Sequence, residues 1–267
     1  MIALPAPFDS FARNRYLIAE LVKRELKDRH VGQTLGVLWA YGHPLLLMLI
    51  YTFLFAYVFP TRFASTGGDQ RDFAVNVLAG VLSWLAFQDI LARSSTILAS
   101  HTSLVKQIVF PVEVLPVKSA IATALPYSVA LVFTIAYAAW SGTLTLMVLT
   151  APFLIVVQLL AMTGIALLLS VLGIFFRDLR DVVTVFCSVN LFAQPILYNP
   201  EALPPIMHRV FMLNPFSYQV WCWQDALYHG SFQHPAAWII YPISALLTFA
   251  IGWATFSRLR PFLGDAL

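Results

Sequence analysis

Long stretches without a charged side chain alternate with short polar or basic segments along this chain. No Asp, Glu, Lys or Arg occurs in the 32 residues between Arg29 and Arg62, or in the 58 residues between Lys118 and Arg177. A helix of the first length would be about 48 Å long, more than the roughly 30 Å of a bilayer's hydrocarbon core. The second stretch is too long for one crossing, so it predicts a hairpin of two spans that turns at residues 141–143 (Ser-Gly-Thr).

The apolar stretches predict an all-α integral membrane protein with six transmembrane helices, in a single domain that covers residues 1–267. The expected spans are about 35–59, 73–92, 117–140, 146–176, 182–199 and 235–256. Segment 92–120 is too polar to span, and Pro111 and Pro116 should break it into short pieces at the inner face. Prolines and charges interrupt residues 200–235, which favours short re-entrant helices before the last span.

Residues 8–31 predict an amphipathic helix ahead of the first span, with Asp9 or Ser10 as its cap. Its apolar residues, which recur at helical spacing, are Phe11, Ile18, Leu21, Val22 and Leu26. Its basic residues include Arg24, Lys27 and Arg29. Such a helix lies in the membrane interface, with basic side chains that reach lipid headgroups. It is either a lipid anchor alone or an anchor that also docks a cytosolic partner.

Composition and charge placement support this layout. The chain is 60% hydrophobic and 11% charged, whereas soluble domains carry about 25% charged residues. In the predicted topology, 13 of the 16 Lys and Arg residues lie on the side that holds both termini. The positive-inside tendency makes that side the cytosol. The net charge of +3 is too small to indicate binding to nucleic acid.

The sequence predicts no catalytic, cofactor-binding or metal-binding residues. There is no Gly-Lys dipeptide, and hence no P-loop, and the HExxH, GxSxG and CxxC motifs are missing. Asp178 and Asp181 form a D-x-x-D pair that could hold Mg²⁺ on a diphosphate. Arg177 and Arg180 alternate with them, so self-neutralising charges on a turn are the better interpretation. A membrane enzyme that acts on a polyprenyl carrier through these aspartates is the alternative.

Five segments, in this order along nearly the whole chain, resemble a known family. They are RELKDRHVGQTLGVLWA at 24–40, LVKQIVFPVEVLP at 104–116, FRDLRDV at 176–182, QPILY at 194–198 and LNPFSY at 213–218. The chain is thereby similar to the permease subunit of type-2 ABC exporters, in the branch that moves lipid-linked polysaccharides such as O-antigen. A type-2 permease for teichoic acid, or for a small lipid or drug, is the alternative within the same class.

The resemblance implies a homodimer of permeases that encloses a channel for a lipid-linked polysaccharide, in the cytoplasmic (inner) membrane. It also implies two copies of a separate ABC ATPase subunit, so that the chain itself has no catalytic site. Two cytosolic segments would contact the ATPase and transmit its rigid-body motion. The implied coupling residues are Leu104, Lys106, Phe110, Pro111 and Glu113 in the first segment, and Arg177, Asp178, Arg180 and Asp181 in the second.

Aromatic residues are frequent in the outer segment that precedes the last span. Sugar rings stack their C–H faces on aromatic rings, so these side chains could guide a glycan through the outer mouth. The candidate glycan contacts are Tyr198, Phe216, Tyr218, Trp221 and Trp223. An ordinary aromatic belt at the membrane interface is the other interpretation.

Overall fold

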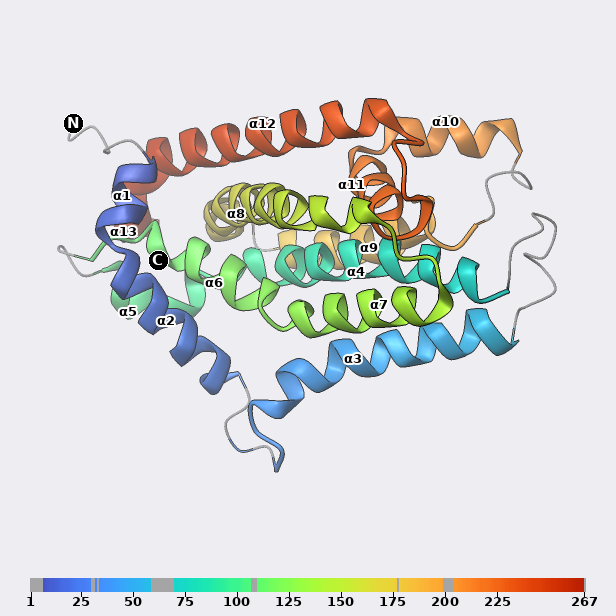
Figure 1. The fold of residues 1–267 in the computed structure, drawn as a ribbon. Helices are drawn as coiled ribbons and strands as arrows, with labels where there is room; N and C mark the ends of the chain where they lie inside the picture. Colours follow the sequence, from blue (N-terminus) through green and yellow to red (C-terminus); the bar gives the residue numbers. More distant parts are fainter. Residues whose placement is uncertain are drawn as a thin grey trace.

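The computed structural model describes residues 7–29, 32, 34–58, 70–106, 110–176, 178–198 and 204–266. These residues form helices and turns and contain no strand, which confirms the all-α class (Figure 1). The long helices are α3 (Leu38–Phe53), α4 (Gln70–Ser94), α7 (Tyr127–Ser141), α8 (Ala151–Phe175) and α12 (Pro235–Leu259). The shorter ones are α1 (Pro7–Arg13), α2 (Arg15–Asp28), α5 (Thr102–Val105), α6 (Val114–Ala124), α9 (Leu179–Phe192), α10 (Pro205–Leu213), α11 (Pro215–Gln224) and α13 (Leu263–Ala266).

Five segments of the described chain are long and apolar enough to cross a membrane. They are Leu38–Val58, Phe73–Ser94, Val114–Ser141, Leu146–Phe175 and Pro235–Phe262. Each includes one long helix together with any short helix that continues it: η1 (Leu54–Val58) after α3, α6 before α7, η5 (Leu146–Thr150) before α8 and η8 (Arg260–Phe262) after α12. The predicted turn between the third and fourth spans is present, because Gly142 ends α7 with φ +76°.

The segment predicted as the fifth of six spans contains only a short helix. Helix α9 has 14 residues, which gives about 21 Å, less than the thickness of a hydrocarbon core. Beyond it the chain forms turns at residues 193–198. Helix α9 packs beside α4, and the Asn190 Oδ1 atom near its end accepts a hydrogen bond of 2.7 Å from Asn214 Nδ2. Five spans therefore have long helices, and the sixth stays a prediction.

Helix α4 lies at the centre of the bundle. It contacts α3, α6, α7, α8, α9 and α11. Of the most apolar 18 residues of its span, 83% are buried, against 17% in the span that begins with α3. The two helices therefore have different environments. Helix α4 is surrounded by protein, whereas α3 leaves most of its apolar surface for lipid or for another protein.

Helices α8 and α12 cross at two glycines, Gly164 and Gly252. A Cβ atom on Gly164 would lie 2.6 Å from the backbone of Phe249, and one on Gly252 would overlap the carbonyl oxygen of Gly164. Small residues of this kind let two membrane helices approach backbone to backbone. A third glycine, Gly173, brings the end of α8 against the backbone of Ser95, in the turn after α4.

The N-terminal segment differs from the prediction of one helix over residues 8–31. It forms two helices, α1 and α2, that meet at Asn14. Neither Asp9 nor Ser10 is a cap, because both lie within α1. The apolar face of α2 is buried through Ile18, Val22 and Leu26 in a cluster with residues of α6. Protein therefore covers the face that the sequence assigned to lipid.

Two short-helix regions agree with the sequence in outline. After α4 the chain forms η4 (Ala99–His101) and α5, as expected for segment 92–120. Pro116, however, lies in the first turn of α6 and does not break it, because a missing N–H is tolerated there. Residues 204–229 form α10, α11 and η7 (Asp225–His229), which are short as predicted.

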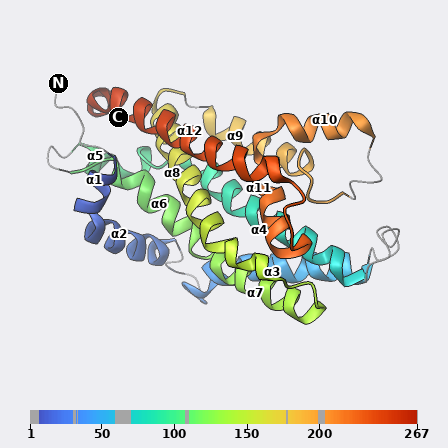
Figure 2. The same cartoon turned by 45° about the horizontal axis from the view of Figure 1, so that its top comes forward.

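The bundle has two distinct ends. Helices α1, α2, α5 and α13 lie at one end, here named the α2 end, and α10 lies at the other, here named the α10 end (Figures 1 and 2). The first and last helices of the described chain thus share one end.

Candidate functional site

A buried ion-pair cluster joins α2 to α6 at the α2 end. Glu25 pairs with Arg29, the residue directly after α2, and the Glu25 Oε2 atom lies 3.0 Å from Lys118 Nζ on α6. Lys118 also lies 3.0 Å from His101 Nε2 in η4. Burial by itself raises the pKa of Glu25, but Arg29 and Lys118 outweigh burial and hold the pKa below its ordinary value. The carboxylate therefore stays ionised and fixes α2 on α6.

The three basic residues expected to reach headgroups divide between two environments. Lys27 is exposed, and so is Arg24, which pairs with Asp28 on the helix surface. The Arg29 side chain is only 14% exposed and donates a hydrogen bond of 3.1 Å to Thr123 in α6. Arg29 thus serves the contact between α2 and α6, whereas the other two remain available to lipid or to a partner.

Glu113, one of the predicted coupling residues, is buried and holds three segments together. Its Oε1 atom accepts a hydrogen bond of 2.8 Å from Ser10 in α1. Its Oε2 atom lies 3.3 Å from Arg260 Nη1 in η8. The Glu113 side chain is 3% exposed, so it lies inside the chain at the α2 end and not on its surface.

The other residues of the first coupling segment surround this buried glutamate. Lys106 is exposed directly after α5, and Leu104 is half-buried. Phe110 and Pro111 are half-buried, and Phe110 packs against the hydrophobic core. Of the five predicted coupling residues in this segment, Lys106 alone is exposed. A groove of about 570 Å³ beside this segment is lined by residues of α2, α5 and α6, including Leu104 and Lys118.

The second coupling segment lies at the junction of α8 and α9. Asp178, Arg180 and Asp181 are exposed there, and Arg177 lies outside the described residues. The contact of Gly173 with Ser95 holds this junction near the turn that leads to α5. The fold therefore places both segments at the α2 end. The metal-ligand cluster found in the described chain does not include the two aspartates.

Three of the five candidate glycan contacts line one pocket at the α10 end. Tyr198, Tyr218 and Trp221 share a pocket of about 380 Å³ with His208 and His234. The rings of Tyr218 and Trp221 meet edge to face with centroids 5.3 Å apart. The Tyr218 hydroxyl donates a hydrogen bond of 2.7 Å to the carbonyl of Met212. These contacts hold the rings in place at the pocket wall.

The other two candidates are packing residues. Phe216 meets Trp84 and Phe87 edge to face, with centroids 5.3 and 5.4 Å apart. Trp223 is 2% exposed, and its Nε1 atom donates a hydrogen bond of 2.9 Å to Gln158. Both rings serve the contacts of α11 inside the bundle. Sequence alone could not separate them from the pocket residues, because all five lie in one aromatic segment.

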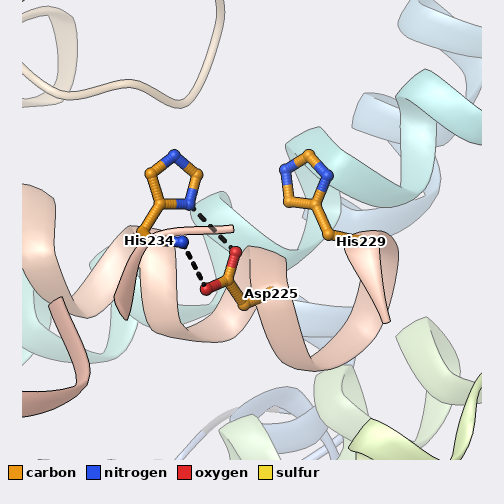
Figure 3. Close-up of side chains that lie close together, drawn as sticks. All are labelled: Asp225, His229 and His234. Atoms are coloured by element: carbon orange, nitrogen blue, oxygen red, sulfur yellow. Dashed lines mark hydrogen bonds and ion pairs between the residues drawn. The ribbon is translucent and has the colours of Figure 1, made fainter. Parts of the chain in front are cut away.

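A cluster of Asp225, His229 and His234 lies beside this pocket, and the sequence prediction missed it (Figure 3). Asp225 is fully buried and accepts a hydrogen bond of 2.9 Å from His234 Nδ1. It accepts two more, of 3.1 Å from the His234 backbone N–H and of 3.0 Å from Trp238 Nε1. The spacing D-x₃-H-x₄-H could have indicated this cluster from the sequence, because the first two residues share one helix face.

The ABC-2 type transporter family matches residues 16–227, from α2 through η7. The chain belongs to this family. Two O-antigen export system permease proteins RfbA of Klebsiella pneumoniae are similar to it, with 25% identity over 253 residues and 24% over 246. Each of these alignments covers 91% of this chain and 92% of the relative. The corresponding Myxococcus xanthus protein is 29% identical over 203 residues, 74% of each chain.

Membership of the ABC-2 family decides the class of protein. An ABC-2 permease is a transporter subunit without a catalytic site of its own, so the alternative of a polyprenyl-carrier enzyme is set aside. The family and the five apolar segments are consistent with a multi-pass protein of the inner membrane. The predicted resemblance to type-2 ABC exporters of the O-antigen branch is confirmed.

Proposed function

We propose that this ABC-2 permease forms half of the channel of an exporter that moves a lipid-linked, O-antigen-like polysaccharide across the cytoplasmic membrane. The observation that carries the proposal is similarity over 91% of the chain to permeases named for O-antigen export. Two copies of the chain would enclose the path, and two copies of a separate ABC ATPase would supply the energy. The largely uncovered apolar surface of α3 leaves room for a second copy or lipid.

In this proposal the α2 end is cytosolic and the chain crosses the membrane six times. Helix α8 runs toward the α2 end, whereas α10 lies at the α10 end (Figure 1). The chain between them, which includes α9, must therefore pass from one end to the other. Helix α12 then returns to the α2 end. This path supports a sixth crossing although α9 alone is too short for one.

The contact with the ATPase would be made by the exposed charges of the two coupling segments, Lys106, Asp178, Arg180 and Asp181. Buried residues behind them would transmit the motion. Phe110 packs on the core, and Glu113 connects the start of α6 to α1 and η8. Since packed elements of this kind move as rigid bodies, a displacement of the exposed charges would shift α6 and the span that it begins.

The proposal predicts the fate of the glycan in cells that lack the gene. We expect lipid-linked glycan to accumulate on the cytosolic side, and the intact gene to restore surface glycan. Lys106→Glu should restore it poorly, because reversing an exposed charge at an electrostatic contact weakens binding of the ATPase by about tenfold or more. Immunoblots of surface glycan and co-purification of the ATPase measure both effects.

Arg209→Glu is the matched control, because it reverses an exposed charge on α10 at the opposite end. It should co-purify with the ATPase like the native chain. Normal surface glycan in cells without the gene would refute the proposed substrate assignment. Equal co-purification of the ATPase with the two variants would refute the proposed coupling contact.

The aromatic pocket at the α10 end would guide the glycan as it leaves. Trp221→Ala removes a ring from the pocket wall. In proteoliposomes, we expect half-maximal stimulation of ATPase activity to require about two- to tenfold more glycan, because one stacking contact is lost. Trp223→Phe is the control, since it removes a buried hydrogen bond and should cost stability of about 1–3 kcal/mol with no change in glycan dependence. Identical glycan dependence in both variants would exclude the pocket as a contact.

A further inference from the structure

Asp225, His229 and His234 have the composition and placement of a transition-metal site (Figure 3). Each offers one ligand atom, and these atoms all lie within 4.8 Å of one another. Imidazole nitrogens and a carboxylate oxygen are the ligands that Zn²⁺ and similar ions take in sites with three protein ligands and one water. We propose that the three residues bind one divalent ion of the Zn²⁺ class, with water in the remaining position.

The backbone brings the ligands together within ten residues. Asp225 and His229 lie one helical turn apart at the two ends of η7. Gly230 then takes φ +66°, which turns the chain and favours glycine, and a Cβ atom there would overlap the side chain of Thr145. His234, the residue before α12, returns the chain to Asp225. The two imidazole rings stand on the same side of the carboxylate (Figure 3).

Neighbouring groups hold two of the three ligands in place. The second oxygen of Asp225 accepts from Trp238 Nε1 and from the His234 backbone N–H. The ring of His234 stacks on Trp221, with centroids 5.2 Å apart and an interplanar angle of 9°. Metal-binding carboxylates and histidines are usually oriented by such outer contacts. One ligand pair has nearly the required spacing, since His234 Nδ1 and Asp225 Oδ1 are 2.9 Å apart and neighbouring ligands of a tetrahedral zinc ion lie about 3.3 Å apart. The three ligand atoms together spread over up to 4.8 Å, so the exposed His229 would move inward as the ion binds.

A simpler account treats Asp225 as a buried carboxylate that is satisfied by His234 and Trp238. In that account His229 serves only packing, because its ring meets Tyr228 edge to face with centroids 4.8 Å apart and lies 5.8 Å from the ring of His234. His229 is exposed and His234 partly so, which gives an ion from the solvent access to the cluster and leaves space for a water ligand. His229 is therefore the residue that separates the two accounts.

The test uses the purified full-length permease without an affinity tag, in detergent. We expect Co²⁺ to give the visible absorption of a tetrahedral site, and Zn²⁺ to displace it at one ion per chain. His229→Gln should weaken Zn²⁺ binding about 100-fold or more, because loss of a ligand exceeds the 10- to 100-fold cost of losing an outer contact. Trp238→Phe, which removes such an outer contact, should fall within that range. His208→Gln, in the wall of the adjacent pocket, should bind like the native chain.

Thermal unfolding of the same variants is the control for correct folding. His229→Gln removes no hydrogen bond found among the described residues and loses only a ring contact with Tyr228, so its melting temperature without metal should lie close to that of the native chain. Added Zn²⁺ should raise the melting temperature of the native chain and of His208→Gln, but not that of His229→Gln. No stoichiometric binding, or equal binding by His229→Gln and the native chain, would overturn the proposal. Neither ATPase nor glycan is needed, so the result is independent of the proposed function.

Discussion

Gly252→Ala is expected to force α8 and α12 apart and to destabilise the bundle by about 3 kcal/mol or more. Overpacking usually costs about 1–3 kcal/mol, and here the added methyl group would overlap a backbone carbonyl, that of Gly164, which cannot rotate away. The expected result is a large drop in melting temperature and in the yield of monodisperse protein. Thermal unfolding in detergent, followed by size-exclusion chromatography, measures both quantities.

Gly42→Ala is the matched control, because it makes the same change within α3. The added methyl group would meet only the Trp39 side chain, at 3.8 Å. Alanine favours a helix over glycine by about 1 kcal/mol, so this variant should be as stable as the native chain or more so. Similar melting temperatures for the two variants would show that α8 and α12 do not touch at Gly252.

Glu25→Gln should release α2 from α6. Lys118, whose side chain is 5% exposed, would keep its charge without a carboxylate partner. Removing one member of a buried pair costs about 3–5 kcal/mol. Hydrogen exchange of residues 15–28 should therefore accelerate strongly, while exchange in α4 stays slow. In the native chain the pKa of Glu25 is below its usual 4.5. Docking of α2 is therefore fully retained above pH 4.5 and is lost as the pH falls through the lowered pKa.

Two further variants test whether the pair itself is responsible. Adding Lys118→Met to Glu25→Gln removes the stranded charge and should recover most of the protection of α2. Glu20→Gln breaks an exposed pair with Lys23 and should change stability by less than about 0.5 kcal/mol. Fast exchange of α2 in the Glu20 variant, or no recovery in the double variant, would contradict the role given to the Glu25–Lys118 pair.

Local chemistry in the sequence predicted local structure well. The absence of charge from residues 119 to 176 together with Gly142 gave the hairpin of the third and fourth spans, because a glycine with positive φ ends a helix where no other residue does so easily. The short α9 was harder to foresee. Residues 182–199 are apolar enough for a span, and only Gln194 and Pro195 indicate where the helix stops.

Long-range pairing is what the sequence could not supply. Glu113 and Arg29 were assigned to a protein surface and to lipid headgroups, but their partners Ser10 and Thr123 lie 103 and 94 residues away along the chain. An amphipathic pattern shows that a face is apolar and does not show whether lipid or another helix covers it. The Asp225–His229–His234 cluster is the opposite case, because its spacing was visible and only its turn geometry was not.

Glu113 also determines how changes at the two ends of the described chain affect each other. Its single carboxylate contacts Ser10 near one extremity and Arg260 near the other. Fusions or truncations near α1 and near η8 are therefore expected to affect each other. A truncation that removed Arg260 would leave the buried Glu113 carboxylate without its cationic partner beside α1. The truncation would therefore destabilise the packing of α1 and of the neighbouring segment that carries Lys106.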